Sequence, residues 1–159
     1  MFNSQAVKIF RMNLVRYSGR FLYLKHISAR LYTWFAVTDT RNVCPTGWHV
    51  PSDAEWTTLT TYLGGESGAG GKLKETGTNH WLSTNTGATN ETGFTTLPGG
   101  SRYAYHFFSN TREGDWGSST EYSFTKTQAY YRNIYNNTSS INSVIGSKED
   151  RYSIRCLKD

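Results

Sequence analysis

The residues that could catalyse a reaction or bind a metal are few, and their spacing matches no known pattern. The four histidines and two cysteines form neither a His-Glu-x-x-His nor a Cys-x-x-Cys motif. His49 follows Cys44 closely, but two ligands do not make a zinc site, so a structural histidine explains it better. Structural hydrogen bonds also explain Glu55 and Glu121 better than acid–base chemistry does. We therefore predict that the protein is not an enzyme.

Sites for phosphate, cofactor and calcium are poorly supported too. The run Gly68-Ala-Gly-Gly71 lacks the Lys-Ser/Thr ending of a phosphate-binding loop. Oxygens of Asn90, Glu91 and Asp115 suit calcium, but isolated residues of these types are more often turn formers. We predict no metal and no cofactor, and leave calcium open.

Residues suited to recognition gather between Glu121 and Ser147, where Tyr, Asn, Ser and Thr dominate. This is the composition of antibody paratopes, in which Tyr supplies rigid contact area and Ser and Asn adapt their hydrogen bonds. The alternative is a sheet that uses Tyr and Thr for their β propensity, since a strand exposes only one face. We predict a ligand-binding surface that includes Tyr103, Tyr105, Tyr122, Phe124, Tyr130, Asn133, Tyr135, Asn137 and Asn142.

One helix must help to position these residues. Ser52 and Glu55 form a capping box, in which each side chain satisfies a backbone N–H of the first turn. Apolar residues then recur at helical spacing from Trp56, and Gly64-Gly65 supplies a left-handed stop. The pattern predicts a helix over residues 53–63.

The rest of the chain is predicted to be short strands and ordered loops. We expect loops over residues 64–71 and 76–96, the second anchored by Trp81 and Phe94, and a turn region over 110–117. Alternation of side chains predicts the strands, the last three as an antiparallel meander. They are Leu31–Val37, Ser101–Phe108, Ala129–Tyr135, Ser140–Ile145 and Arg151–Leu157.

Length and charge suggest one domain preceded by a basic segment. The chain has 159 residues, of which 36% are hydrophobic and 15% aromatic, with a net charge of +5. Six Lys and Arg residues precede the first acidic residue, Asp39, and we treat residues 1–30 as a lead-in or assembly segment and 31–159 as the domain. No nucleic-acid-binding motif accompanies this charge, so we expect no nucleic-acid partner. Neither a signal peptide nor a membrane span is recognised.

Several motifs together resemble one family, the Fibrobacter succinogenes major paralogous (FISUMP) domain, from about Leu31 to the C-terminus. The resemblance implies an α+β fold similar to the formylglycine-generating-enzyme type of C-type lectin domain. Formylglycine-generating enzymes use a reactive cysteine pair near copper, whereas the cysteines here fall at structural positions. The motifs are Cys44-Pro-Thr-Gly-Trp-His-Val-Pro-Ser-Asp-Ala-Glu-Trp56, Gly70-Gly-Lys-Leu-Lys-Glu-Thr-Gly-Thr-Asn-His-Trp81, Leu97-Pro-Gly-Gly-Ser-Arg102, Trp116-Gly-Ser-Ser-Thr-Glu121 and Tyr152-Ser-Ile-Arg-Cys-Leu-Lys-Asp159.

The same motifs contain the residues to which we assign scaffold roles. Two states of the cysteines stay open, a disulfide between the start and the end of the domain or two buried thiols. The predicted structural residues are Cys44, Cys156, Ser52, Glu55, Trp48, Trp56 and Trp116.

Some lectin-fold proteins of this kind are diversified by retroelements that randomise adenine-containing codons. The interval 121–150 is compatible with such a variable face, and we hold this as a hypothesis. We expect recognition of a protein or glycan at a bacterial or phage surface, with the protein extracellular, on a cell surface or in a virion. The alternative is a structural surface or virion protein without a soluble ligand, which self-associates through residues 1–30.

Overall fold

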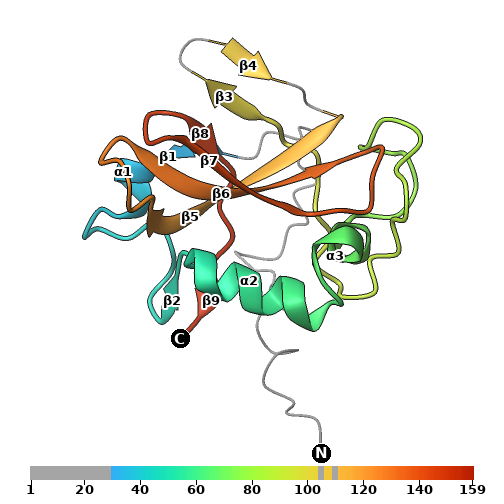
Figure 1. The fold of residues 1–159 in the computed structure, drawn as a ribbon, viewed down its shortest axis with the longest axis horizontal. Coiled ribbons are helices and arrows are strands. Elements are labelled where there is room, and N and C mark those ends of the chain that lie inside the picture. Colours follow the sequence, from blue (N-terminus) through green and yellow to red (C-terminus); the bar gives the residue numbers. More distant parts are fainter. Residues whose placement is uncertain (1–29, 104–105, 109–110) are drawn as a thin grey trace, which may run out of the picture.

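The computed structural model describes residues 30–103, 106–108 and 111–159. These residues form three helices and three antiparallel sheets (Figure 1), so the fold is mixed α+β with short antiparallel sheets, as predicted. The sheets have the strand orders β1-β8-β3-β4, β2-β9 and β5-β6-β7. The elements are β1 (Tyr32–Thr33), α1 (Trp34–Val37), β2 (Trp48–His49), α2 (Asp53–Tyr62), α3 (Glu66–Leu73), β3 (Ser101–Tyr103), β4 (His106–Phe108), β5 (Glu113–Glu121), β6 (Gln128–Tyr135), β7 (Asn142–Ser147), β8 (Arg151–Tyr152) and β9 (Leu157–Lys158).

The predicted helix is confirmed as α2. The Ser52 side chain accepts from the backbone N–H of Glu55, and the Glu55 carboxylate accepts from the backbone N–H of Ser52. Leu63 ends the helix, and Gly64 and Gly65 follow with φ of 96° and 97°, a conformation that favours glycine. α2 lies across one face of the β5-β6-β7 sheet (Figure 1).

The prediction of a loop over residues 64–71 is wrong, because residues 66–73 form α3. The glycines that suggested a loop serve close packing instead. A Cβ on Gly70 would lie 2.2 Å from the carbonyl oxygen of Ser140, and one on Gly71 would lie 2.3 Å from that of Gly87. The helix therefore exists because tertiary contacts override the weak helix propensity of glycine.

Two other predicted strands are interrupted. The segment Leu31–Val37 is strand only at β1. The Thr33 side chain then accepts from the backbone N–H of Ala36 and starts α1. The segment Ser101–Phe108 is not one strand, because β3 and β4 pair with each other antiparallel, with Tyr103 opposite His106.

The predicted C-terminal meander is displaced by one strand. β6 and β7 pair as expected, but their third partner is β5, which begins at Glu113, inside the region over residues 110–117 that was predicted to be a turn. The last predicted strand is split between β8, which joins β1 and β3, and β9, which pairs with β2.

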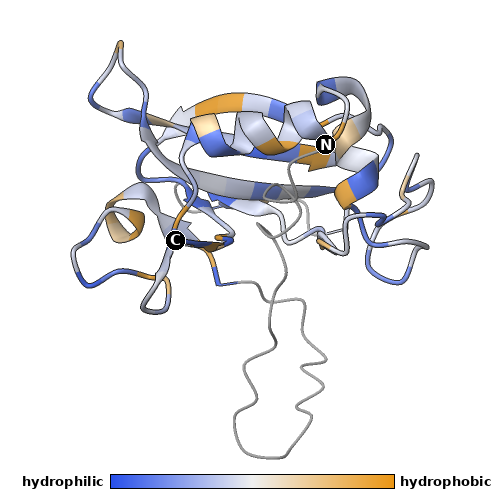
Figure 2. Ribbon diagram, turned by 90° about the horizontal axis from the view of Figure 1, so that it is seen from below, coloured by the Kyte–Doolittle hydropathy of each residue, from blue (hydrophilic) through white to orange (hydrophobic). Residues whose placement is uncertain are grey.

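The main core lies between the helices and the β5-β6-β7 sheet. It includes the predicted anchors Trp81 and Phe94, which are 1% and 4% exposed. Trp81 Nε1 donates to the carbonyl oxygen of Thr96 over 2.9 Å and so fixes the long segment between α3 and β3. Hydrophobic patches alternate with hydrophilic stretches along the helices, the strands and the loops (Figure 2).

A second apolar cluster joins the two ends of the described domain. Cys44 and Cys156 form a disulfide across a sequence separation of 112 residues, and Val37 and Val50 pack beside it. Of the two states left open by the sequence, the structure has the disulfide. No helix among the described residues is long and apolar enough to cross a membrane.

Candidate functional site

Three of the predicted binding residues meet where β5 and β6 are connected. The ring of Tyr122 lies 5.4 Å from that of Phe124 and 5.6 Å from that of Tyr130, with the Tyr122 and Tyr130 rings nearly perpendicular. Ile145 of β7 is paired directly with Tyr130 and therefore shares its face of the sheet. We call these four residues, Tyr122, Phe124, Tyr130 and Ile145, the aromatic surface.

Exposure sets the aromatic surface apart from ordinary core packing. Phe124 is 83% exposed and Ile145 is 38% exposed. Isolated exposed apolar residues are common, but rings that contact each other on a surface form a patch of the kind that marks interaction sites. The rim is polar, with the exposed Ser143 and Ser147 on β7.

Local hydrogen bonds hold the connection that carries Phe124. The backbone N–H of Tyr122 donates to the carbonyl oxygen of Gln128, and that of Thr125 donates to the carbonyl oxygen of Tyr122. The Thr120 hydroxyl accepts from the backbone N–H of Asp53, which ties this end of β5 to the first turn of α2. The aromatic rings are therefore displayed by a braced hairpin.

An ion pair supports the same hairpin from the other face. The Lys148 ammonium bonds the carboxylate of Glu121 and lies 3.9 Å from the centroid of the Trp34 ring. The hydrogen bond from Lys148 lowers the pKa of Glu121. Because Lys148 is 5% exposed, this charge is held by its two partners and serves to fix the turn between β7 and β8.

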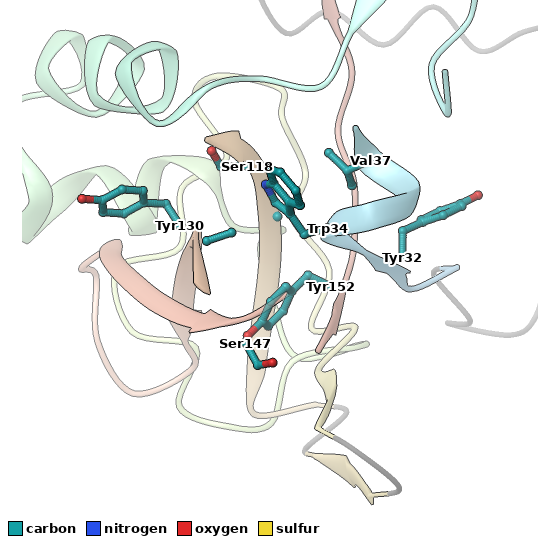
Figure 3. Close-up of a pocket in the computed structure, with 9 residues that line it drawn as sticks. Tyr32, Trp34, Val37, Ser118, Tyr130, Ser147 and Tyr152 are labelled. Carbon is teal, nitrogen blue, oxygen red and sulfur yellow. The ribbon is translucent and has the colours of Figure 1, made fainter. Parts of the chain in front are cut away.

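A small pocket lies beside this ion pair (Figure 3). Trp34 lines it between Val37 and Tyr152, with Ser118 and Ser147 at the sides. The ring of Tyr130 is directed away from Trp34, so this residue contributes to the pocket wall while its ring belongs to the aromatic surface. The pocket and the aromatic surface are thus neighbouring but separate features.

The opposite face of β6 carries a buried polar network. Asn133 is 3% exposed and donates through Nδ2 to Oδ1 of Asp115 over 2.6 Å. Asn142 Nδ2 lies 3.5 Å from Oδ1 of Asn133. Burial raises the pKa of Asp115, and burial together with the Asp115 charge raises the pKa of Glu113. Asn133 therefore belongs to the interior, which corrects its assignment to an exposed binding surface.

The remaining predicted binding residues do not join the aromatic surface. Tyr103 contacts Phe108 and Tyr152, with ring centroids 5.1 Å and 6.2 Å away. Tyr135 is 40% exposed on the Asn133 face, and Asn137 is exposed in the turn after β6. Tyr105 lies outside the described residues.

Sequence reasoning missed two parts of this site. Ile145 could not be assigned, because only the β6–β7 register places it opposite Tyr130. The pairing of Lys148 with Glu121 joins residues that are 27 positions apart, which no local motif indicates. The mixed charges of Glu121, Lys126 and Lys148 along the sequence were the only available sign of an ion-pair network.

The predicted scaffold residues show structural contacts. Trp56 and Trp116 are buried in the main core, and Trp48 packs against the cluster around the disulfide. His49 Nδ1 lies 2.5 Å from Oδ1 of Asp159, and its Nε2 lies 3.0 Å from Oε1 of Glu55. Among the described residues no group of three His, Cys, Asp or Glu side chains could hold a metal ion.

Comparison with known proteins identifies the family. The family model described as the Fibrobacter succinogenes major domain matches residues 5–158. The chain therefore belongs to the Fibrobacter succinogenes major domain family, and the match includes most of the basic segment that precedes β1. No curated protein and no solved structure matches the chain.

Proposed function

We propose that this domain is a recognition module that binds a protein or glycan ligand through the aromatic surface. The observation that supports this most is the ring cluster of the exposed Phe124 and the half-buried Tyr122 and Tyr130, on a hairpin that is braced on both faces. Rings that are already ordered lose little conformational entropy when a ligand binds. Their flat faces suit either the apolar side of a sugar ring or the side chains of a protein.

The proposal extends to the fold and the setting. A C-type-lectin-like domain is supported by the disulfide and the β2-β9 pair, which join the start of the domain to its end. An exposed contact surface can bind a ligand without a cofactor. This accords with a role in binding, without catalysis, outside the cell or on a virion. A disulfide is typical of oxidising compartments.

Diversification by a retroelement is part of the same proposal. Within residues 121–150, the exposed positions Phe124, Ser143, Ile145 and Ser147 could vary without disturbing the core, whereas Ile134 and Ile141 are fully buried. Comparing the gene with a neighbouring template repeat tests this idea. Differences confined to adenine positions and to exposed codons support it, and differences at other bases refute it.

An array of glycans and of bacterial and phage-host surface proteins tests the binding function. The folded protein is screened beside the variant Phe124→Ser, since Phe124 is 83% exposed and its loss should leave folding unchanged. We expect specific binding that Phe124→Ser removes at an unchanged melting temperature. Binding that the variant retains would place the site elsewhere, and absence of any binding would contradict the proposal.

A further inference from the structure

The β1-β8-β3-β4 sheet has a basic row on the face turned away from the β5-β6-β7 sheet. Direct pairing places Arg151 opposite Arg102, and Arg102 opposite Phe107. Residues paired in this way share a face, so the three side chains lie side by side across the sheet. Tyr152 follows Arg151 in β8, so its side chain lies on the opposite face of this sheet. That face is turned toward the β5-β6-β7 sheet, because Tyr152 stacks on Tyr131 of β6 with ring centroids 4.3 Å apart.

The two arginines of this row carry uncompensated charge. Like charges that are directly opposed on paired strands destabilise a sheet. Neither Arg102 nor Arg151 has an ion-pair partner among the described residues, and Arg102 Nε is buried without a hydrogen-bond partner there. The sequence from Ser101 to Arg112 contains two arginines and one histidine but no acidic residue. An added carboxylate beside these guanidinium groups would therefore relieve the repulsion.

The free edge of the sheet lies beside this charge. β4 is the last strand of its sheet, and no described strand pairs with its outer edge. Its three residues are all exposed, Phe107 by 74%. The Arg102 guanidinium lies over the Phe107 ring, 5.1 Å from its centroid, so the charge reaches outward from β3 to β4. The β3–β4 hairpin projects from the body of the molecule (Figure 1), which leaves this edge accessible to another chain.

We propose that β4 binds an extended acidic segment of a partner polypeptide as an additional strand. Main-chain hydrogen bonds to the outer edge of β4 would supply affinity, as in other cases of strand addition. A Glu or Asp side chain placed beside Phe107 would meet the guanidinium of Arg102 and form a charge-assisted pair. This docking surface involves none of the residues of the aromatic surface, so it stands whether or not the proposed function is correct.

Fluorescence anisotropy with labelled peptides tests this inference on the full chain. The first probe is a short peptide of alternating Glu and Thr. A second probe is the same peptide with methylated backbone nitrogens, which keeps the charge but removes the backbone donors, and a third replaces Glu by Gln. A short oligogalacturonate tests whether an acidic glycan takes the site instead. Because the contact is ionic, titrations are run at low and at physiological salt.

The protein variants separate charge from strand pairing. Arg102→Gln should weaken binding of the Glu-Thr peptide about tenfold or more, as expected for the loss of a charge-assisted pair. Phe107→Ser alters a largely exposed position and gives a second variant should Arg102→Gln unfold. Arg41→Gln is the matched control, because Arg41 is 89% exposed in its side chain and lies outside the hairpin. Phe124→Ser should also leave peptide binding unchanged.

Among the three peptides, we expect only the Glu-Thr peptide to bind, with binding weakened about tenfold or more by Arg102→Gln and also weakened by Phe107→Ser. Equal binding of the N-methylated peptide would show that charge attracts the peptide without strand addition, and would overturn the inference. Tighter binding of the oligogalacturonate than of the Glu-Thr peptide would indicate that the row of Arg151, Arg102 and Phe107 binds an acidic glycan, and would overturn the inference. Binding unaffected by Arg102→Gln, or no binding by any peptide, would also overturn the inference.

Discussion

Tyr130 and Tyr135 lie on opposite faces of β6, although both are tyrosines of one Tyr- and Asn-rich strand. Tyr130 shares its face with Arg132, which bonds α2, and with Ile145 on the neighbouring strand. Tyr135 shares its face with Asn133, which bonds the buried Asp115. The composition that suggested one binding surface is therefore divided between a displayed ring cluster and an interior polar network.

Two glycines of α3 provide a matched test of close packing. Gly70→Ala should lower the free energy of unfolding by about 1–3 kcal/mol, because the new Cβ would meet the Ser140 carbonyl. Gly68→Ala should raise it by about 0.5–1 kcal/mol, since nothing lies within 4 Å of that Cβ and alanine favours helix. Urea unfolding of both variants checks this. Equal effects would refute the role assigned to Gly70.

Lys74 is predicted to hold three backbone segments together. Its ammonium donates to the carbonyl oxygens of Thr86 and Thr138, both over 2.8 Å, and to that of Tyr135 over 3.2 Å. Burial lowers the pKa of Lys74 to about 8, so the group keeps its proton at neutral pH. Lys74→Met should cost about 2–4 kcal/mol of unfolding free energy, because it leaves buried carbonyl oxygens unpaired.

The control for this prediction is Lys72→Met. Lys72 forms a partly exposed ion pair with Glu91 over 3.1 Å, and its loss should cost less than about 1 kcal/mol. Denaturant unfolding of the two variants compares a caged lysine with a surface lysine of the same segment. Similar destabilisation by both would contradict the role assigned to Lys74.

The hydrogen bonds of His49 lead us to predict that the stability of the folded protein depends on pH. The hydrogen bond with Asp159 raises the pKa of His49 against the smaller effect of burial, and Glu55 adds to the rise. Both ring nitrogens face carboxylate oxygens, so only the protonated ring donates to both. The folded pKa is above the unfolded value, so this stabilisation is complete below about pH 6.5 and is lost as pH rises through the folded pKa.

The variant His49→Gln isolates this effect. The stability of the unmodified protein should fall modestly, by less than about 1 kcal/mol, as pH rises from about 6.5 through the folded pKa of His49, because the pair is partly exposed. His49→Gln should lack this component when unfolding is measured across the same range. An unchanged pH slope in the variant would show that His49 does not contribute.

The disulfide should contribute strongly to stability. Cys44 and Cys156 are separated by 112 residues, and closing so long a loop restricts the unfolded chain. The double variant Cys44→Ser/Cys156→Ser should lose about 2–5 kcal/mol of unfolding free energy. Reductant should destabilise the unmodified protein and leave the double variant unaffected. A reductant effect of equal size on both would exclude the disulfide as its cause.

The parts of the fold that the sequence predicts are those with local causes. The start and end of α2 follow from Ser52, Glu55 and the Gly64-Gly65 stop, all within a few residues. α3 was missed because Gly70 is explained only by Ser140, which is distant in sequence. The overall α+β class and the family follow from motifs, whereas the β5-β6-β7 order depends on long-range pairing.

The candidate site, like the fold, was predictable only where local sequence determines it. Composition indicated Tyr122, Phe124 and Tyr130, but alternation along a strand says only that two faces differ. α2 packs on the Tyr130 face, where Arg132 bonds Asp53. On the opposite face, which carries Asn133, Tyr131 stacks on Tyr152. Exposure along β6 is therefore set by long-range packing on both faces of the sheet. Asn133 was therefore assigned to the surface when it lies inside.

The most direct test of the recognition function uses the two faces of β6. With a ligand identified on the array, its dissociation constant is measured for Tyr130→Ser and Tyr135→Ser, each checked for an unchanged melting temperature. We predict that Tyr130→Ser raises the dissociation constant about tenfold or more, as for a residue central to an interface, while Tyr135→Ser changes it less than about twofold. Equal effects of the two variants, or a larger effect of Tyr135→Ser, would contradict the assignment of the aromatic surface as the binding site.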